Sequence, residues 1–256
     1  MPKATGAAAR HRRPHAAAIG RSLDIYYRDT DRTARMDRLH AAFVTPGAPV
    51  FDIGAHVGDR TGSFLRHGAS VVALEPQPQV FRALRLIHGR HPAAVLLPAA
   101  AGAAPGTLTL HLNTRNPTVS TVAPGFLSAA ADAPGWRDEV WDGTVTVPVV
   151  TLDLLIARHG LPAFVKIDVE GHEPAVLQGL SAPLPALSFE FTTIQRRAAH
   201  ACIARLGALG RYAYNLSLGE EHRLRHDVWL TAAEMQAELD ALPETANSGD
   251  VYARRV

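Results

Sequence analysis

Cysteine and long apolar runs are both scarce in this chain of 256 residues. The single cysteine, Cys202, cannot form an intrachain disulfide, and its place on a predicted amphipathic helix is typical of a small core residue. No apolar run approaches the roughly 18 to 20 residues that span a bilayer, and residues 16–19 are too short for the apolar core of a signal peptide. We therefore expect no membrane span and a cytoplasmic location.

Acidic residues are missing from the first 21 positions, which hold five Lys or Arg residues. The remainder has 21 basic and 24 acidic residues, so the body of the chain carries a net charge of −3. A mildly acidic body argues against a broad nucleic-acid-binding face. With its Ala, Gly and Pro, the segment 1–21 is predicted to be a disordered basic arm, and a docking segment is the alternative.

The region after the arm has a helical pattern. Met36, Leu39 and Phe43 are spaced to share one face of a helix, and Pro46 begins the turn that ends it. We therefore predict an N-terminal helical cap over residues 22–48.

Strands and helices alternate from residue 49 to residue 256, which predicts an α/β domain with a mostly parallel sheet. The predicted strands are 49–54, 70–75, 93–98, 163–168, 186–191, 211–217 and 224–230, and the predicted helices are 58–67, 78–89, 151–159, 173–180, 195–208 and one from Thr231. Thr231 and Glu234 have the spacing of a capping box. Residues 106–150 interrupt the alternation and are predicted to be an irregular insertion or lid over the site.

A glycine turn follows the first predicted strand. Residues 50–58 read Val-Phe-Asp-Ile-Gly-Ala-His-Val-Gly, in which Gly54 and Gly58 allow the backbone to approach a ligand without Cβ atoms in the way. The helix that follows contributes free N–H groups. Glu75, about 20 residues beyond the turn, is placed to accept hydrogen bonds from two ribose hydroxyls, so we expect a ligand that contains a nucleoside.

The fourth predicted strand leads into the strongest chemical signal of the chain. It runs directly into Asp168, Glu170 and His172, an arrangement typical of a reaction centre. In an open parallel sheet, ligands bind beyond the carboxyl ends of the strands, where the strand order reverses. We therefore expect Asp52, Glu75 and Asp168 to converge there.

The glycine spacing distinguishes between classes of nucleoside. A dinucleotide site prefers GxGxxG, whereas this turn has GxxxG with His56 in place of the middle glycine. Asp52 beside the turn would repel phosphates but suits the amine and sulfonium of S-adenosylmethionine. No Tyr has a Lys four residues later, so the Tyr/Lys pair of short-chain dehydrogenases is missing. An NAD-linked oxidoreductase on the same architecture is the enzyme alternative, and a non-catalytic nucleoside-binding domain is the non-enzyme alternative.

These residues resemble the FkbM-type S-adenosylmethionine-dependent methyltransferases. The resemblance covers about residues 50–191 and rests on FDIGAHVG at 51–58, LEP at 74–76, TLD at 151–153 and VKIDVEGHE at 165–173. It implies a Rossmann-like, seven-stranded, mostly parallel sheet of the class I methyltransferase type. It also implies O-methylation of a hydroxyl group on a sugar, a glycolipid or a polyketide-type natural product.

The family pattern also implies a set of cofactor contacts. They fall on Asp52, Gly54, Ala55, His56, Gly58, Glu75, Pro76, Ala100 and Asp168. Residues 100–103 read Ala-Ala-Gly-Ala where the family commonly has an acid, so an adenine contact there would come from the backbone. The serine-rich element that often follows is matched only loosely at 118–121.

Methyl transfer to a hydroxyl needs a base within hydrogen-bond reach, because an alkyl hydroxyl is a poor nucleophile until its proton leaves. His172 is the first candidate, since imidazole titrates near neutrality, and Glu170 or Glu173 can orient it. Asp168 is expected to hold the cofactor amine or the acceptor. In the structural alternative, Asp168 and Glu170 accept N–H bonds at the helix that begins near Pro174, and His172 is a turn residue.

A divalent metal site is a further alternative for these carboxylates. Asp168, Glu170, His172 and Glu190 supply ligand atoms, but no compact spacing such as HExxH is present. We therefore expect no metal centre.

The acceptor is expected to be a small molecule or a glycan. The Asp/Asn-Pro-Pro-aromatic motif of amino-group methyltransferases that act on bases is missing, which argues against nucleic acid. Trp136 and Trp141 in the insertion are candidates for a sugar-stacking surface, and ordinary packing is the alternative.

Overall fold

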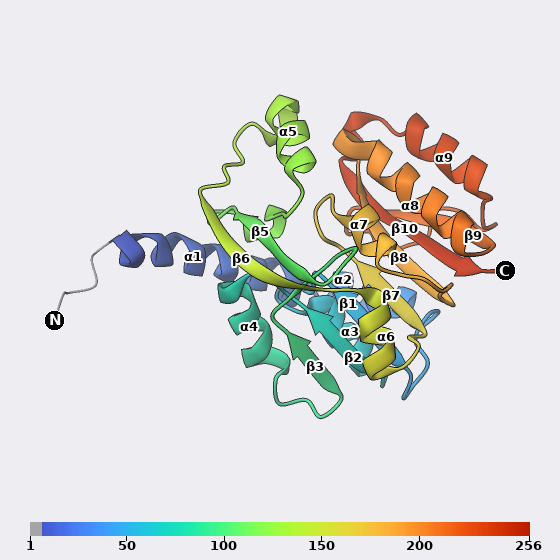
Figure 1. Cartoon of the computed structure of the whole chain (residues 1–256), viewed down its shortest axis with the longest axis horizontal. Coiled ribbons are helices and arrows are strands. Elements are labelled where there is room, and N and C mark those ends of the chain that lie inside the picture. Colours follow the sequence, from blue (N-terminus) through green and yellow to red (C-terminus); the bar gives the residue numbers. More distant parts are fainter. Residues whose placement is uncertain (1–6) are drawn as a thin grey trace.

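The chain folds around a sheet of seven strands (Figure 1). The computed structural model describes the backbone of residues 7–256 and the side chains of residues 16–256. The strands are β1 (Pro49–Ile53), β2 (Ser70–Leu74), β3 (Ala94–Leu97), β7 (Phe164–Ile167), β8 (Ala186–Thr192), β9 (Tyr212–Leu218) and β10 (Ser248–Arg255). Their order is β3-β2-β1-β7-β8-β10-β9, and β10 runs antiparallel to both of its neighbours while the other pairs are parallel. The predicted seven-stranded, mostly parallel sheet of the class I methyltransferase type is confirmed.

Helices cover both faces of this sheet. One face carries α2 (Thr30–His40), α3 (Asp59–Arg66) and α4 (Pro78–His88), and the other carries α6 (Leu152–His159), α7 (Glu173–Gln178), α8 (Arg196–Leu209) and α9 (Ala232–Ala241). Side chains alternate along each strand, so Phe51 and Ile53 of β1 join the core on one face and Val50 joins the core on the other. None of the described helices is both long and apolar enough to cross a membrane.

The strand order reverses at β1. The chain runs from β1 outward to β2 and β3, and it later returns to the opposite side of β1 with β7 and β8. The carboxyl ends of these parallel strands lie at one edge of the sheet. The predicted site residues follow β1, β2 and β7, so the topology brings them to the same edge.

Residues 106–150 are more regular than predicted. β5 (Gly106–Leu112) and β6 (Gly143–Val150) form an antiparallel pair, and β4 (Ala100–Ala101) extends it to a second sheet of three strands. The connection between β5 and β6 contains α5 (Pro124–Asp132) and the short 3₁₀ turns η1 (Pro117–Val119) and η2 (Pro134–Trp136). Leu110, Val147 and Val149 pack together in this sheet, and the alternation of Val with polar residues along β6 is the sequence signal that indicates it.

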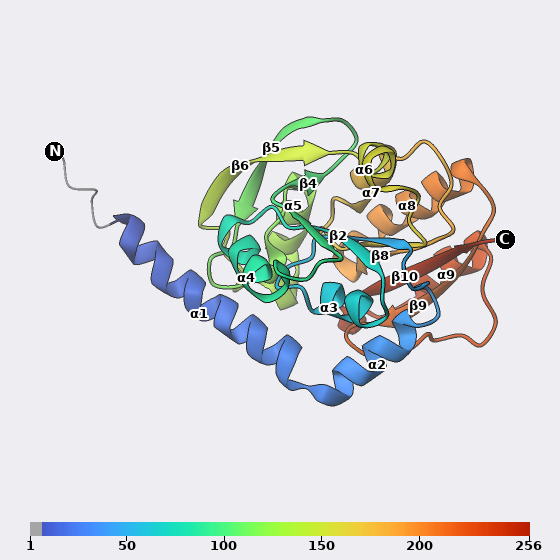
Figure 2. The ribbon, with the colours of Figure 1, turned by 90° about the horizontal axis from the view of Figure 1, so that it is seen from below.

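The N-terminal segment is helical. α1 (Ala7–Arg28) is followed by α2, whose N-cap Asp29 accepts a hydrogen bond from Arg32 N. Figure 2 shows α1 running along one side of the body and extending beyond it. The prediction of a disordered arm is wrong for residues 7–21, because the high helix propensity of its alanines offsets the Gly and Pro on which that prediction rested. Residues 1–6 lie outside the described residues.

The seventh strand is not the one that the sequence indicated. Residues 224–230 form no strand, and only Leu230 pairs with Tyr214 in an isolated bridge. β10 takes the position between β8 and β9 instead. The apolar stretch of β10 is too short to predict a strand from the local sequence. Pairing with β8 on one side and β9 on the other stabilises this strand. The predicted capping box of Thr231 and Glu234 is confirmed at the start of α9.

Candidate active site

A cavity lies at the carboxyl ends of β1, β2, β7 and β8. Its wall also includes residues of α1, of the inserted sheet and of the loop before β10. The predicted site residues that line it are Gly54, Ala55, His56, Glu75, Pro76, Ala100, Asp168, Glu170 and His172. Asp52 and Gly58 do not line it. The reversal of strand order therefore brings together most of the predicted residues but not all of them.

The Asp52 carboxylate lies in the protein interior. It is 1% exposed, and Thr61 Oγ1 donates a hydrogen bond of 2.6 Å to its Oδ2. Burial raises the pKa of Asp52 to about 6. The structure thus gives Asp52 a place between β1 and α3 and does not bring it to the predicted cofactor contact.

Packing against protein requires both glycines of the turn. Gly54 has a φ of +86°, and a Cβ there would lie 1.7 Å from the carbonyl oxygen of Asp168. Gly58 has a φ of +88°, and a Cβ there would lie 2.5 Å from Leu84 Cδ1. L side chains rarely adopt these backbone conformations. The glycines therefore allow a close approach between β1 and β7 at Gly54, and between the turn and α4 at Gly58.

Glu75 follows β2 and is 2% exposed. Its Oε2 accepts a hydrogen bond of 3.0 Å from His56 N, and its Oε1 accepts one of 2.7 Å from Gln77 N. Burial raises the pKa of Glu75 to about 7, although these backbone donors act in the opposite direction. The two bonds fix the carboxylate in one orientation, and each oxygen keeps acceptor capacity for a ligand hydroxyl.

Several buried polar atoms on the cavity wall have no hydrogen-bond partner within the described structure. They are His56 Nε2, Gln77 Oε1, His172 Nε2 and Glu190 Oε2. Buried polar groups in folded proteins are nearly always paired. A polar ligand in the cavity would supply the missing partners.

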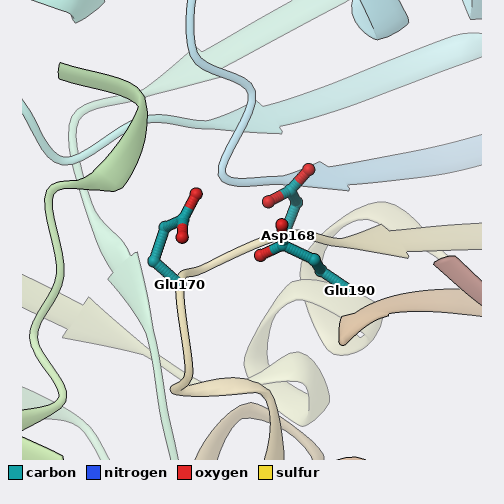
Figure 3. A group of neighbouring side chains, drawn as sticks. All are labelled: Asp168, Glu170 and Glu190. Carbon is teal, nitrogen blue, oxygen red and sulfur yellow. The ribbon is translucent and has the colours of Figure 1, made fainter. Parts of the chain in front are cut away.

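Three carboxylates gather where β7 and β8 end (Figure 3). One oxygen atom from each of Asp168, Glu170 and Glu190 lies within 4.8 Å of the other two. Lys166 Nζ contacts Asp168 Oδ2 at 3.1 Å and Asp250 Oδ1 at 2.6 Å. Burial and the charge of Asp168 raise the pKa of Glu170 and of Glu190 well above the usual range. Burial acts on Asp168 in the same direction, but the Lys166 and Arg60 cations and the hydrogen bonds to this carboxylate together outweigh burial and lower the pKa of Asp168.

His172 is the N-cap residue of α7, and its partly buried ring lines the cavity. Burial lowers the pKa of His172, so the imidazole is neutral near pH 7 and can accept a proton. The prediction that Glu170 or Glu173 orients this ring is wrong. Glu173 Oε1 instead accepts hydrogen bonds from Val169 N at 2.9 Å and Gly171 N at 3.3 Å, so it stabilises the turn before α7.

Tyr26 and Gln77 are among the residues of the cavity wall that sequence reasoning missed. Tyr26 of α1 lines it, with its ring edge-on to His56 at 5.8 Å and beneath the Arg32 guanidinium at 4.9 Å. Gln77 lines it too, and its Nε2 donates a hydrogen bond of 3.0 Å to Pro117 O. The adjacent pair Tyr26 and Tyr27, in a chain with five tyrosines, is the one signal that indicated a function for α1.

The two tryptophans of the insertion differ in position. Trp136 lines the cavity and meets Phe126 edge-on at 5.2 Å. Trp141 does not line it, and its Nε1 donates a hydrogen bond of 2.9 Å to Val119 O. Trp136 is thus the one of the pair that is accessible to a ligand in the cavity.

The fold and the cavity together define a class. A seven-stranded sheet with one antiparallel strand, a cavity where the strand order reverses and a buried acid after the second strand are features of the Rossmann-like methyltransferases. Residues 52–211, more than half of the chain, match the family model described as the Methyltransferase FkbM domain. The chain belongs to this family of FkbM methyltransferases.

One curated relative and two solved structures illustrate the range of similarity. The hexuronic acid methyltransferase AglP of Haloferax volcanii is 26% identical over 147 residues, which are 57% of this chain and 55% of the relative. The chain thus spans about half the length of the curated relative that it matches. An O-methyltransferase from Bacillus cereus in complex with SAH is 12% identical with a TM-score of 0.47, covering 100% of this chain and 93% of that one. A TehB-like SAM-dependent methyltransferase from Corynebacterium glutamicum is 11% identical with a TM-score of 0.44, covering 97% and 100%.

Proposed function

We propose that this chain is an S-adenosylmethionine-dependent O-methyltransferase. Its acceptor is a hydroxyl group on a sugar, a glycolipid or a polyketide-type natural product. The observation that carries the proposal is a single cavity that holds carboxylates on two sides. Its wall includes the Glu75 carboxylate, fixed by two backbone N–H groups, and the carboxylates near the ends of β7 and β8. Membership of a methyltransferase family supports the same reaction class.

The residues of the cavity fit S-adenosylmethionine. Glu75 would accept hydrogen bonds from the two ribose hydroxyls, and the unpaired Gln77 Oε1 would accept one from the adenine amino group. Ala100 and Leu110 supply apolar wall for the base, and Asp168 would hold either the cofactor ammonium or the acceptor. When bound, the cofactor supplies a methyl group that its sulfonium activates.

His172 is the proposed general base. Its Nε2 is unpaired within the described structure and lies on the cavity wall, so it is free to accept a proton from the acceptor hydroxyl. His172 Nε2 would take this proton as the acceptor oxygen bonds to the methyl carbon, and the cofactor sulfur would leave with the electron pair of its bond to that carbon. A base in this position typically contributes about 10²- to 10⁴-fold to the rate.

The charge of the cavity wall limits the choice of acceptor. Seven acidic residues and one arginine line it. Such a surface offers the phosphates of nucleic acid a single cationic partner, whereas it offers many hydrogen-bonding groups to a polyol. Trp136 on the wall provides an aromatic face for a sugar ring. The relative whose name refers to a hexuronic acid also supports a sugar-type acceptor.

The proposed place of this reaction is the cytoplasm. The single cysteine, Cys202, is free and buried on α8, as in proteins of a reducing compartment. A protease-protection assay on fractionated host cells tests this location.

The decisive experiment combines cofactor titration with methyl transfer. Calorimetric titration of the purified chain with S-adenosylhomocysteine and with NAD is expected to show binding of the first alone. Incubation with methyl-labelled S-adenosylmethionine and extracted host metabolites, followed by mass spectrometry, is expected to show label on a hydroxyl oxygen. NAD binding would favour the oxidoreductase alternative. Cofactor binding without transfer to any acceptor would favour a non-catalytic nucleoside-binding domain.

A further inference from the structure

We propose that Asp168, Glu170 and Glu190 bind a divalent metal ion, Mg²⁺ or Mn²⁺, beside the acceptor. The sequence offers no compact ligand spacing, but the pairing of β7 with β8 supplies the proximity that the sequence lacks. The proposal that a metal ion binds here is argued from this cluster and does not depend on the proposed function. The role of the metal ion toward the acceptor rests on the proposed O-methyltransferase function.

The geometry of the cluster matches a shared ion. Carboxylate oxygens bind Mg²⁺ at about 2.1 Å and larger divalent ions at up to about 2.6 Å, so two oxygens on one ion lie at most about 4 to 5 Å apart. The ligand atoms of the three carboxylates lie within 4.8 Å of one another. Figure 3 shows the three side chains beside one another, with Asp168 and Glu170 on the segment that follows β7 and Glu190 on β8. Two oxygens on one Mg²⁺ lie at most about 4.2 Å apart, so binding of this ion would draw the three carboxylates slightly closer together.

Glu170 gives a second observation that indicates a ligand. Its side chain is 7% exposed and lines the cavity, yet its carboxylate accepts no hydrogen bond from any residue that the structure describes. The residue also has a φ of +53°, a conformation that is unfavourable for a residue other than glycine. Thr121 Oγ1 donates a hydrogen bond of 2.7 Å to the Glu170 carbonyl oxygen and supports this conformation. The turn therefore directs a buried acid, without a donor of its own, toward two other acids.

The surrounding charges do not neutralise the cluster. Lys166 pairs with Asp168 and with a carboxylate of β10. The arginine of the cavity wall, Arg60, is engaged with two other carboxylates. Within the described residues, Glu170 and Glu190 have no ion pair with Lys or Arg. Ionising both glutamates without a cation nearby is costly, and one divalent ion would compensate the charge of both.

A metal ion at this position would define the chemical class of the acceptor. A Mg²⁺ or Mn²⁺ ion that is bound by three carboxylates has further coordination positions, which other oxygen ligands can occupy. An acceptor with two adjacent oxygens, either vicinal hydroxyls or a hydroxyl beside a carboxylate, would chelate the ion. Coordination lowers the pKa of a bound hydroxyl, as it does for water, so His172 would take the proton more readily. The same ion would allow an acidic sugar to bind in a cavity lined by acids.

The test is a titration of the metal-free full-length chain with MnCl₂, followed by the electron paramagnetic resonance signal of free Mn²⁺. We expect one tightly bound Mn²⁺ per wild-type chain, and binding at least about tenfold weaker in Glu170→Gln and in Glu190→Gln. Glu244→Gln is the matched control, because Glu244 is exposed and does not line the cavity. This control is expected to bind Mn²⁺ as the wild type does.

Two further measurements distinguish a failure of the proposed metal site from a failure of the proposed function. Thermal melting is expected to show that Mn²⁺ raises the Tm of the wild type and of Glu244→Gln but not of the cluster variants, all of which melt cooperatively without metal. Wild-type chain that binds no Mn²⁺, or cluster variants that bind it as tightly as the wild type, would overturn the metal site. If S-adenosylhomocysteine displaces Mn²⁺ and the cluster variants bind S-adenosylhomocysteine more weakly, the cluster holds the cofactor ammonium and the metal site is likewise overturned. Mn²⁺ binding without methyl transfer to any acceptor would instead leave the metal site standing and contradict the proposed function.

Discussion

The two sides of the cavity hold their carboxylates in different ways. On the β2 side, both oxygens of Glu75 accept hydrogen bonds from backbone N–H groups. On the side of β7 and β8, the carboxylate of Glu170 accepts no hydrogen bond from the described residues, and Glu190 Oε2 has no partner. A group that is fixed before binding is preorganised for one ligand. The β2 side is therefore suited to the cofactor, which is the same in every reaction. The carboxylates on the side of β7 and β8 instead gain their partners from the ligand that binds there.

The largest effect on stability is expected at Gly54, where the two sides of the cavity meet. In Gly54→Ala the new Cβ would lie 1.7 Å from the Asp168 carbonyl oxygen at a φ of +86°, so β1 and β7 must separate. We expect a loss of about 3–5 kcal/mol in the free energy of unfolding, measured by urea denaturation. Gly207→Ala is the control, because a Cβ on this residue of α8 meets nothing within 4 Å and alanine favours the helix. Equal stability of the two variants would contradict the close approach.

On the acceptor side, His172→Ala tests the base. We expect unchanged affinity for S-adenosylhomocysteine and a turnover that is lower by about 10²-fold or more, because the acceptor hydroxyl loses its proton acceptor. Steady-state kinetics with the labelled cofactor measures the turnover. His91→Ala, at an exposed position outside the cavity, should keep full activity. Full activity of His172→Ala would remove this residue as the base.

On the cofactor side, Glu75→Ala tests the ribose contact. Removing hydrogen bonds to a buried ligand is expected to weaken cofactor binding by about 1–3 kcal/mol. Calorimetric titration with S-adenosylhomocysteine measures this change, and exposed Glu221→Ala serves as the control. An affinity equal to that of the wild type would reject the assigned role of Glu75.

The pH dependence of cofactor affinity is expected to show a smaller effect, and it tests the ionised Glu75 carboxylate more specifically. The pKa of Glu75 is raised to about 7 by burial, so the carboxylate is protonated below this pH. The ionised form accepts hydrogen bonds at both oxygens, whereas the protonated form has lost acceptor capacity. Affinity is therefore expected to fall as pH decreases through 7, by up to roughly tenfold per pH unit. Titrations between pH 6 and pH 8 should show this slope in the wild type and a flat response in Glu75→Gln.

Much of the cofactor side could be predicted from local sequence. Glu75 sits at the end of a short apolar strand, after a glycine turn whose spacing is visible in the chain. The prediction was less accurate at Asp52, because β1 places this side chain against Thr61 and not on the cavity wall. Position at the end of a strand gives the location of a residue but not the direction of its side chain.

Other sequence predictions failed because a local pattern does not decide which groups pair in the fold. β10 is defined by its pairing with β8 and β9, so a local pattern selected residues 224–230 instead. Glu173 lies next to His172 in sequence but turns to the backbone N–H groups of Val169 and Gly171. Neighbours in sequence therefore do not establish a hydrogen bond between side chains.

The sequence by itself determined the alternation of strands and helices, the glycine turn and the family, because these depend on residue order and local backbone preference. Only the tertiary structure decided which acids meet. Asp168 and Glu190 are adjacent because β7 pairs with β8, and Glu170 joins them because the turn after β7 takes a positive φ. Electrostatic interaction depends on distance in space and on burial, and neither quantity can be obtained from positions along the chain.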